Sequence, residues 1–231
     1  MPKSPDRLRL ASYNLHKCRG MTGPHAPERN LRVIAELDAD VIALQEVDFR
    51  FGARPEALPR KLIEKTTGMV PAPFLGTGEN SLGWHGQTIL LRPELRDKAE
   101  IRRLPLPGIE PRGALVLRLP GLTVVAVHLG LMRSSRRAQL SRIIAQSRRI
   151  GHDRMALTGD FNEWHDSRGL EALEALRVIT PGPSWPAPFP RLRYDRFAVS
   201  RSIEVLDCGV LDNEMARAAS DHLPVWADLA V

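Results

Sequence analysis

The sequence of 231 residues has only two cysteines, and they are poorly placed for the sites that cysteines usually build. Cys18 and Cys208 lie far apart, so they have neither the spacing of a metal site nor the density of a disulfide framework. No group of cysteines and histidines has the spacing of zinc ligands. We therefore expect two free thiols in a reducing compartment.

Long hydrophobic runs are also missing. No apolar run approaches the roughly 20 residues that a membrane-spanning helix needs, and residues 1–7 are not followed by the apolar segment of a secretory signal. We therefore expect no transmembrane segment and a cytoplasmic location. Because the sequence contains no internal repeat, low-complexity segment or linker, we expect a single domain over residues 1–231, and we expect it to be a monomer.

Two catalytic signatures are absent as well. The chain has no nucleophile elbow of the kind that presents a catalytic serine. It also has no glycine-rich loop of the nucleotide-binding kind, which would cradle phosphates with backbone N–H groups. These absences argue against a serine hydrolase and against a nucleotide-binding fold of that type.

The composition that remains is that of a basic globular protein. Apolar residues make up 43% of the chain, which is enough for a core, and the net charge is +6 with arginine as the main cation. Arginine suits two-pronged contact with phosphate, so nucleic acid, anionic lipid headgroups and phosphorylated small molecules are all possible partners. The same positive net charge would also arise, without any such partner, in an organism whose proteins are generally rich in arginine.

Apolar periodicity divides the chain into strands and helices. It predicts strands at 8–13, 41–44, 86–91, 99–104, 112–119, 122–127, 154–157, 193–200, 203–210 and 225–229. It predicts helices at 28–37, 59–68, 134–150 and 168–175. The strand–helix–strand order at 8–44 is that of an α/β unit. The turn at Pro120 and Gly121 predicts an antiparallel hairpin.

The helix at 134–150 carries a run of arginines on one side of its sequence pattern. We expect these side chains to form a solvated face, as such runs usually do. They are Arg136, Arg137, Arg142, Arg148 and Arg149.

Polar side chains recur where the predicted strands end. The residues at these boundaries are Asn14, Glu46, His128, Asp160, Asn162 and His222. Any one of them has an ordinary alternative, since Asp and Asn favour turns and a histidine after a strand is usually structural. Asp160 and Asn162 are two residues apart, so in extended backbone they point to the same side. Together the six predict a cleft at one edge of a sheet.

The chemistry of this set suits a phosphoester. Glu46, with Asn14 and either Asp160 or Asp221, offers the hard oxygens that Mg²⁺ or Mn²⁺ prefers. The two histidines can contact phosphate oxygens or transfer protons near neutral pH. Asp160 can activate a water that Asn162 positions, and Arg112 can neutralise an anionic oxygen. We therefore predict hydrolysis of a phosphoester with a bound metal ion.

Seven short segments, in order, resemble the endonuclease/exonuclease/phosphatase superfamily, which has the fold of pancreatic-type deoxyribonuclease and of exonuclease III. The segments are Tyr13-Asn14-Leu15-His16, Gln45-Glu46-Val47, Arg112-Gly113-Ala114, His128-Leu129-Gly130, Gly159-Asp160-Phe161-Asn162, Tyr194-Asp195-Arg196 and Ser220-Asp221-His222-Leu223-Pro224-Val225. The resemblance covers nearly the whole chain. It implies an α/β (α+β) fold: a four-layer sandwich of two packed mixed β-sheets flanked by helices.

The resemblance also implies a role for each matching residue. Glu46 would be the main ligand of Mg²⁺ or Mn²⁺, with Asn14 and Asp221 helping. Asp160 and Asn162 would hold the attacking water and stabilise the transition state. His222, oriented by Asp195, would contact the scissile phosphate. His128 and Arg112 would bind phosphate oxygens.

Two positions depart from the family pattern. Gln87 stands where an asparagine is common, so a hydrogen bond to phosphate is not expected to be kept there in its usual form. His16 stands near the place where some nucleases of the family carry a second acid beside the metal, which weakens the case for two metal ions.

Three functional hypotheses follow. The first is a metal-dependent phosphodiesterase acting on DNA or RNA, supported by the net charge and the arginines. The second is a phosphodiesterase or phosphatase acting on a phospholipid or a small phosphorylated metabolite; the short first motif resembles that of small bacterial members without an assigned substrate. The third is a non-catalytic module that binds polyanions, against which the joint presence of Glu46, Asp160 and His222 argues.

Overall fold

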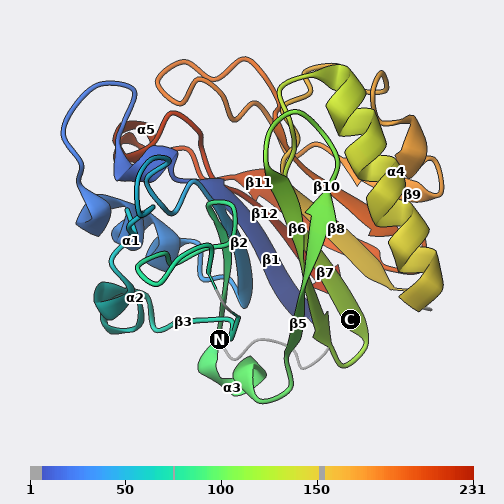
Figure 1. Cartoon of the computed structure of the whole chain (residues 1–231), viewed down its shortest axis with the longest axis horizontal. Coiled ribbons are helices and arrows are strands. Elements are labelled where there is room, and N and C mark those ends of the chain that lie inside the picture. Colours follow the sequence, from blue (N-terminus) through green and yellow to red (C-terminus); the bar gives the residue numbers. More distant parts are fainter. Residues whose placement is uncertain (1–6, 75, 151–153) are drawn as a thin grey trace.

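Two six-stranded β-sheets form the centre of the protein in a computed structural model that describes residues 7–74, 76–150 and 154–231 (Figure 1). The first sheet has the order β11 (Glu204–Val210), β12 (Val225–Ala230), β1 (Arg7–Asn14), β2 (Val41–Gln45), β4 (Gln87–Leu91) and β3 (Val70–Pro71). The second has the order β5 (Glu100–Leu106), β6 (Arg112–Leu119), β7 (Leu122–His128), β8 (Met155–Asp160), β10 (Asp195–Ser200) and β9 (Leu176–Ile179). Each sheet is mixed, since β1–β2 and β7–β8 pair in parallel and the other neighbours are antiparallel.

Helices cover the outer face of each sheet and complete four layers, as the resemblance implies. The first sheet is covered by α1 (Pro27–Glu36), α2 (Arg60–Thr67) and α5 (Glu214–Ala219), and the second by α4 (Arg133–Ile150) (Figure 1). One apolar cluster lies between the sheets, and two others lie between a sheet and its helices. Strands buried on both faces explain the nearly continuous apolar runs of the sequence, such as that of β2.

The short elements differ most from the sequence prediction. The prediction of a helix at 168–175 is wrong. This segment contains a 3₁₀ turn, η2 (Glu171–Leu173), and is followed by β9. The sequence also did not predict β3, β9, α5 or the short helix α3 (Pro93–Arg96). Elements of two to six residues carry too little periodicity to be recognised, and the two strands among them, β3 and β9, are determined by pairing with a longer neighbour.

The strand register brings the site together. Asn14 pairs with Gln45, directly before Glu46, and His128 pairs with Asp160. Asp195 lies opposite Asp160 on the other side of β8. The ends of these strands therefore meet at one edge of the molecule, which is at the top of Figure 1.

No helix within the part of the chain that the structure describes is long and apolar enough to cross a membrane. The two cysteines are free thiols: Cys18 is buried, and Cys208 is partly exposed.

Candidate active site

A buried carboxylate, Asp160, is the centre of the polar cluster at this edge. Asn14 Nδ2 donates to its Oδ2 at 3.1 Å, and the backbone N–H of Asn162 donates to its Oδ1 at 2.8 Å. His128 Nε2 and His222 Nε2 lie 3.5 and 3.8 Å from Oδ2. The structure thus brings together five of the predicted residues from both sheets.

The surroundings of Asp160 make it a base. Burial is the largest influence and raises the pKa of this carboxyl, and the charge of Asp195 raises it further. The charge of His222 and the hydrogen bonds from Asn162 and Asn14 act in the opposite direction, and the resulting pKa is about 6. A carboxylate with a pKa just below neutral is ionised at pH 7 and still basic enough to take a proton from water.

His222 is held by a second buried carboxylate. Its Nδ1 donates to Asp195 Oδ2 at 2.8 Å, and the same oxygen accepts the hydroxyl of Ser184 at 2.6 Å. Burial alone would lower the pKa of His222, but the charges of Asp195 and Asp160 outweigh it and raise the pKa to about 10. The imidazole is therefore a fixed cation at neutral pH, with Nε2 directed toward Asp160.

His128 has the opposite electrostatic character. Burial and the positive charge of Arg112 lower its pKa well below the ordinary value, against the pull of Glu46. It is neutral at pH 7, so one ring nitrogen donates and the other accepts. The two histidines beside Asp160 therefore offer different chemistry, one as a cation and one as a neutral hydrogen-bonding group.

Glu46 lies at the rim of the cluster and already has a cationic partner. Lys17, from the 3₁₀ turn η1 (His16–Cys18), donates from Nζ to Glu46 Oε2. Burial raises the pKa of Glu46, but the charge of Lys17 and this hydrogen bond act against burial and hold the pKa below its ordinary value. Sequence reasoning missed Lys17, although it stands in the polar segment that follows the first strand.

The predicted metal ligands offer suitable chemistry but are not gathered into a cage. Asp221 Oδ1 lies 3.8 Å from His16 Nδ1, and Ser220 ties this segment to β1 by donating to the carbonyl of Asn14 at 2.6 Å. Among the described residues, no group of three His, Cys, Asp or Glu side chains could hold a metal ion. The oxygens of Glu46 and Asn14 suit Mg²⁺, and the Lys17 ammonium stands in for a cation against Glu46.

The chain turns at Asn162, two residues after β8 (Met155–Asp160) ends at Asp160. Its φ of 51° is in the left-handed region, which asparagine tolerates better than most residues. Its Nδ2 donates to the carbonyl of Leu129 at 2.9 Å, so that the side chain bridges the ends of β7 and β8. The turn explains why its backbone N–H can reach back to Asp160.

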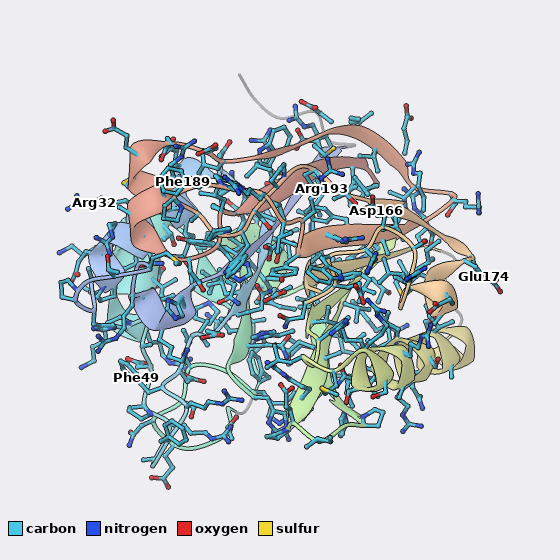
Figure 2. All side chains as sticks on the ribbon, turned by 90° about the horizontal axis from the view of Figure 1, so that it is seen from above. Arg32, Phe49, Asp166, Glu174, Phe189 and Arg193 are labelled. Carbon is cyan, nitrogen blue, oxygen red and sulfur yellow. The ribbon has the colours of Figure 1, made fainter. Side chains whose placement is uncertain are left out.

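Arg112 lies in the wall of a small basic pocket beside this cluster. Its Nη2 donates to Glu110 Oε2 at 2.8 Å, which fixes the guanidinium at the start of β6. The pocket has a volume of about 90 Å³. Its lining residues are Lys17, Glu46, Asp48, Phe49, Arg50, Arg54, His85, Gly86, Pro111, Arg112 and His128. Figure 2 views the molecule from this end, with Phe49 on one side and Phe189 and Arg193 on the other.

Gln87 takes a structural position rather than one in the pocket wall. It is fully buried, and its Nε2 donates to the carbonyl of Gly113 at 2.7 Å. This bond joins the first sheet to the second beneath the pocket. The departure at position 87 therefore leaves a side chain that fastens the two sheets together.

Arg136 corrects the prediction of a fully solvated arginine face on α4. Its side chain is buried, and Nη2 donates to Glu163 Oε2 at 2.6 Å. Arg133 donates to the same carboxylate at 3.0 Å. Glu163 is itself buried, so it needs cationic partners, and the pair holds the turn that begins at Asn162. Arg137 and Arg142 are exposed, and the side chains of Arg148 and Arg149 lie outside the described set.

Comparison with known proteins agrees with the fold described above. A profile of the Endonuclease/Exonuclease/phosphatase family matches residues 11–222. No curated protein matches the sequence. The fold is similar to the endonuclease/exonuclease/phosphatase of Beutenbergia cavernae DSM 12333, with a TM-score of 0.71, 19% identity and coverage of 98% of this chain and 72% of that one.

Two further solved structures share the fold. The mannosyl-6-phosphatase of Bacteroides thetaiotaomicron VPI-5482 has a TM-score of 0.70 and 19% identity, with 97% of this chain and all of that chain covered (100%). TDP2 of D. rerio, complexed with a single-strand DNA product, has a TM-score of 0.71 and 16% identity, with 97% and 99% covered. TM-scores of 0.70 and 0.71 show that these proteins share the fold of this chain, and at such low identities they show the fold alone.

Proposed function

Since the chain belongs to the endonuclease/exonuclease/phosphatase family, whose members are phosphoesterases, nucleases and phosphatases, we propose that it hydrolyses phosphodiester bonds with an activated water. The observation that carries the proposal is the buried Asp160, with a raised pKa and with Asn14, Asn162 and two histidines around it. A buried carboxylate among groups that bind anions is poorly suited to a merely structural role.

The residues divide the work as follows. Asp160, oriented by Asn14, accepts a proton from the attacking water. His222, kept cationic by Asp195, neutralises charge that develops on the phosphoryl oxygens. Neutral His128 hydrogen-bonds another of these oxygens.

Two further residues bind the substrate phosphate. Arg112, in the pocket wall, is an anion-binding group fixed by Glu110. Asn162, whose Nδ2 is fixed by donating to the Leu129 carbonyl at the end of β8, would contact the water and a phosphoryl oxygen there.

Glu46, with Asn14 and Asp221, would hold Mg²⁺ or Mn²⁺. When bound, such an ion polarises a phosphoryl oxygen and neutralises negative charge. The support is the donor chemistry of these residues and the lowered pKa of Glu46, which keeps it ionised. The Lys17 ammonium already contacts Oε2 of Glu46, so it would compete with an ion for this carboxylate.

Two substrate classes fit the same chemistry. Nucleic acid is the first, supported by the net charge of +6 and by the basic pocket. A phospholipid or a small phosphorylated metabolite is the second. The fold is found both in a protein with a single-strand DNA product and in a mannosyl-6-phosphatase, so the fold supports both classes equally.

The test is a substrate panel with the purified protein and Mg²⁺. It contains plasmid DNA, single-stranded DNA, RNA and bis(p-nitrophenyl) phosphate, a small diester. We expect Asp160→Asn to lower kcat by about 10³-fold or more, because the general base is lost. Glu171→Gln changes an exposed acid that pairs with Arg137 and contacts no residue of the proposed site, so it is the matched control and should keep wild-type activity. Equal activity of wild type and Asp160→Asn on every substrate would contradict the proposal.

A further inference from the structure

Large apolar side chains are exposed around the mouth of the site. The exposed large apolar residues of the described chain are Met21, Phe51, Ile109, Leu131, Met132, Trp164, Phe189 and Leu206. Leu206 lies in the strand β11, whereas the others lie in loops that lead to or from the strand ends at the site. Isolated apolar residues on a surface are normal, but their collection at one end marks an interaction surface.

Four of these residues lie on three neighbouring loops beside the site, and we call them the apolar rim. Ile109, Leu131, Met132 and Trp164 are 87%, 63%, 56% and 59% exposed. Ile109 precedes Arg112 in the β5–β6 turn, Leu131 and Met132 follow His128, and Trp164 follows Asn162. The apolar rim thus belongs to three loops that each begin or end at a residue of the proposed site.

Hydrogen bonds join the first two of these loops. The backbone N–H of Leu131 donates to Glu110 Oε1 at 3.0 Å. Gln139 from α4 binds both loops, because its Nε2 donates to the carbonyl of Pro107 and its Oε1 accepts the N–H of Gly130, each at 2.9 Å. The loops that carry Ile109 and Leu131 are therefore fixed side by side.

The third loop is fastened to the second by ion pairs. Arg133, next to Met132 in the chain, donates to Glu163 at 3.0 Å, and Glu163 directly precedes Trp164. The three loops are fixed and leave the apolar side chains of the rim exposed to water. Removing these side chains from water would lower the free energy. A fixed, exposed apolar surface of this kind is expected to be covered by a partner.

Positive charge surrounds the apolar rim. Arg50, Arg168, Arg191 and Arg193 are exposed on loops at the same end, and their side chains form no ion pair with other described residues. Figure 2 shows Arg193 and Phe189 at this end. Asp166, 73% exposed, is an acid on the loop of Trp164, so the positive charge is not uniform.

Apolar side chains flanked by arginines suit one kind of partner. We propose that the apolar rim docks the protein onto an anionic phospholipid bilayer, with the mouth of the site facing the lipid headgroups. Aliphatic side chains such as Ile109, Leu131 and Met132 gain from contact with acyl chains, and arginines bind headgroup phosphates. A single-stranded nucleic acid would instead stack on aromatic platforms. The three loops of the apolar rim carry one exposed aromatic side chain, Trp164, and the other exposed aromatics of the described chain, Phe51 and Phe189, lie on separate loops.

The substrate that this surface implies is a phosphoester carried by a membrane lipid. This second part rests on the proposed hydrolysis, whereas docking itself does not. The two are therefore tested separately, docking by vesicle binding and hydrolysis by activity on bis(p-nitrophenyl) phosphate.

The experiment measures flotation of the full chain with vesicles of phosphatidylcholine containing phosphatidylglycerol. We expect wild type to float with these vesicles and less with pure phosphatidylcholine. The tryptophan emission of the protein, to which the exposed Trp164 contributes, should shift to shorter wavelength on binding. The double variant Ile109→Ser, Leu131→Ser should lower partitioning by about tenfold or more while keeping activity on the soluble diester. Leu206→Ser, which changes an equally apolar residue on β11, is the matched control and should bind as wild type.

Three outcomes would overturn docking. Wild type that fails to float with anionic vesicles would do so, as would a double variant that floats like wild type. If the double variant lost binding to single-stranded DNA but bound vesicles like wild type, the apolar rim would be a nucleic-acid surface instead. Asp160→Asn should float normally, so a protein that binds vesicles but hydrolyses nothing would leave docking intact and overturn the proposed function.

Discussion

At the scale of single residues, the site depends on pairing groups with opposed electrostatics. Asp160 is a buried base with a raised pKa, and the neighbouring His222 is a buried cation. Each arrangement would be costly alone, because an isolated buried charge is unfavourable. Asp195 makes the pair possible, since it supplies the negative charge that keeps His222 protonated beside Asp160.

The pairing of His222 with Asp195 predicts a pH dependence of stability. The pKa of His222 is about 10 in the folded protein and about 6.5 when unfolded, so the stabilisation is complete below pH 6.5 and declines as pH rises toward 10. Each pH unit in this window corresponds to at most about 1.4 kcal/mol. Urea unfolding of wild type and Asp195→Asn should therefore differ most below pH 6.5 and progressively less toward pH 10. A difference that grows with pH would contradict the assignment.

The ion pair between Lys17 and Glu46 predicts an effect on metal affinity. In Lys17→Met the Glu46 carboxylate no longer has a competing cation, so Mn²⁺ should bind more tightly by up to about fivefold, the equivalent of a partly exposed ion pair of up to about 1 kcal/mol. Calorimetric titration with Mn²⁺ measures this without reference to activity. Arg19→Met, an exposed cation two residues away, is the control. Equal affinity of Lys17→Met and wild type would show that Lys17 and the ion do not share Glu46.

At the scale of elements, close pairing of β7 with β8 places Asp160, the carboxylate of the proposed mechanism. Gly159 lies in β8 opposite Val127, with a φ of 147°, and a Cβ atom there would lie 1.9 Å from the carbonyl oxygen of Val127. Only glycine fits this approach. The next residue is Asp160, so the same contact that excludes a side chain at 159 fixes the direction of the carboxylate.

Gly159→Ala should consequently destabilise the protein by about 3 kcal/mol, because backbone strain and a steric clash act together. Gly121→Ala is a matched control, since Gly121 also has a positive φ, of 78°, but no atom lies within 4 Å of the added Cβ. Urea unfolding should show a clearly smaller loss for Gly121→Ala. Equal losses at the two positions would mean that the contact with Val127 relaxes without cost.

At the scale of the whole molecule, the site belongs to both sheets. Asn14 and Glu46 come from the first sheet and Asp160, His128 and Asp195 from the second, with the main apolar cluster between them. Neither sheet holds the cluster of polar groups alone. Separation of the sheets would therefore dismantle the site.

This arrangement predicts one cooperative unfolding transition. Melting curves from far-ultraviolet circular dichroism and from tryptophan fluorescence should coincide, because Trp84 packs in the cluster between the sheets and reports their association. Loss of activity on bis(p-nitrophenyl) phosphate should follow the same curve. Two separated transitions would instead indicate that the sheets unfold independently, and would contradict the prediction of a single domain over residues 1–231.

The sequence by itself determined the long strands, the longer helices and the polar residue at each strand end, because these follow from local periodicity. It also placed Asp195 with His222 through the resemblance, and the structure brings them to 2.8 Å. The short strands β3 and β9 and the burial of Arg136 could not be predicted, since each depends on a partner distant in the chain.

Only the tertiary structure decided what each polar group contacts. Lys17 meets Glu46 across 29 positions of sequence, and Asn14 meets Asp160 across 146. Periodicity reports on which face of an element a residue lies, but hydrogen bonds and pKa values depend on which elements become neighbours. The same reason applies to the apolar rim, whose residues look like ordinary loop positions until packing brings their three loops together.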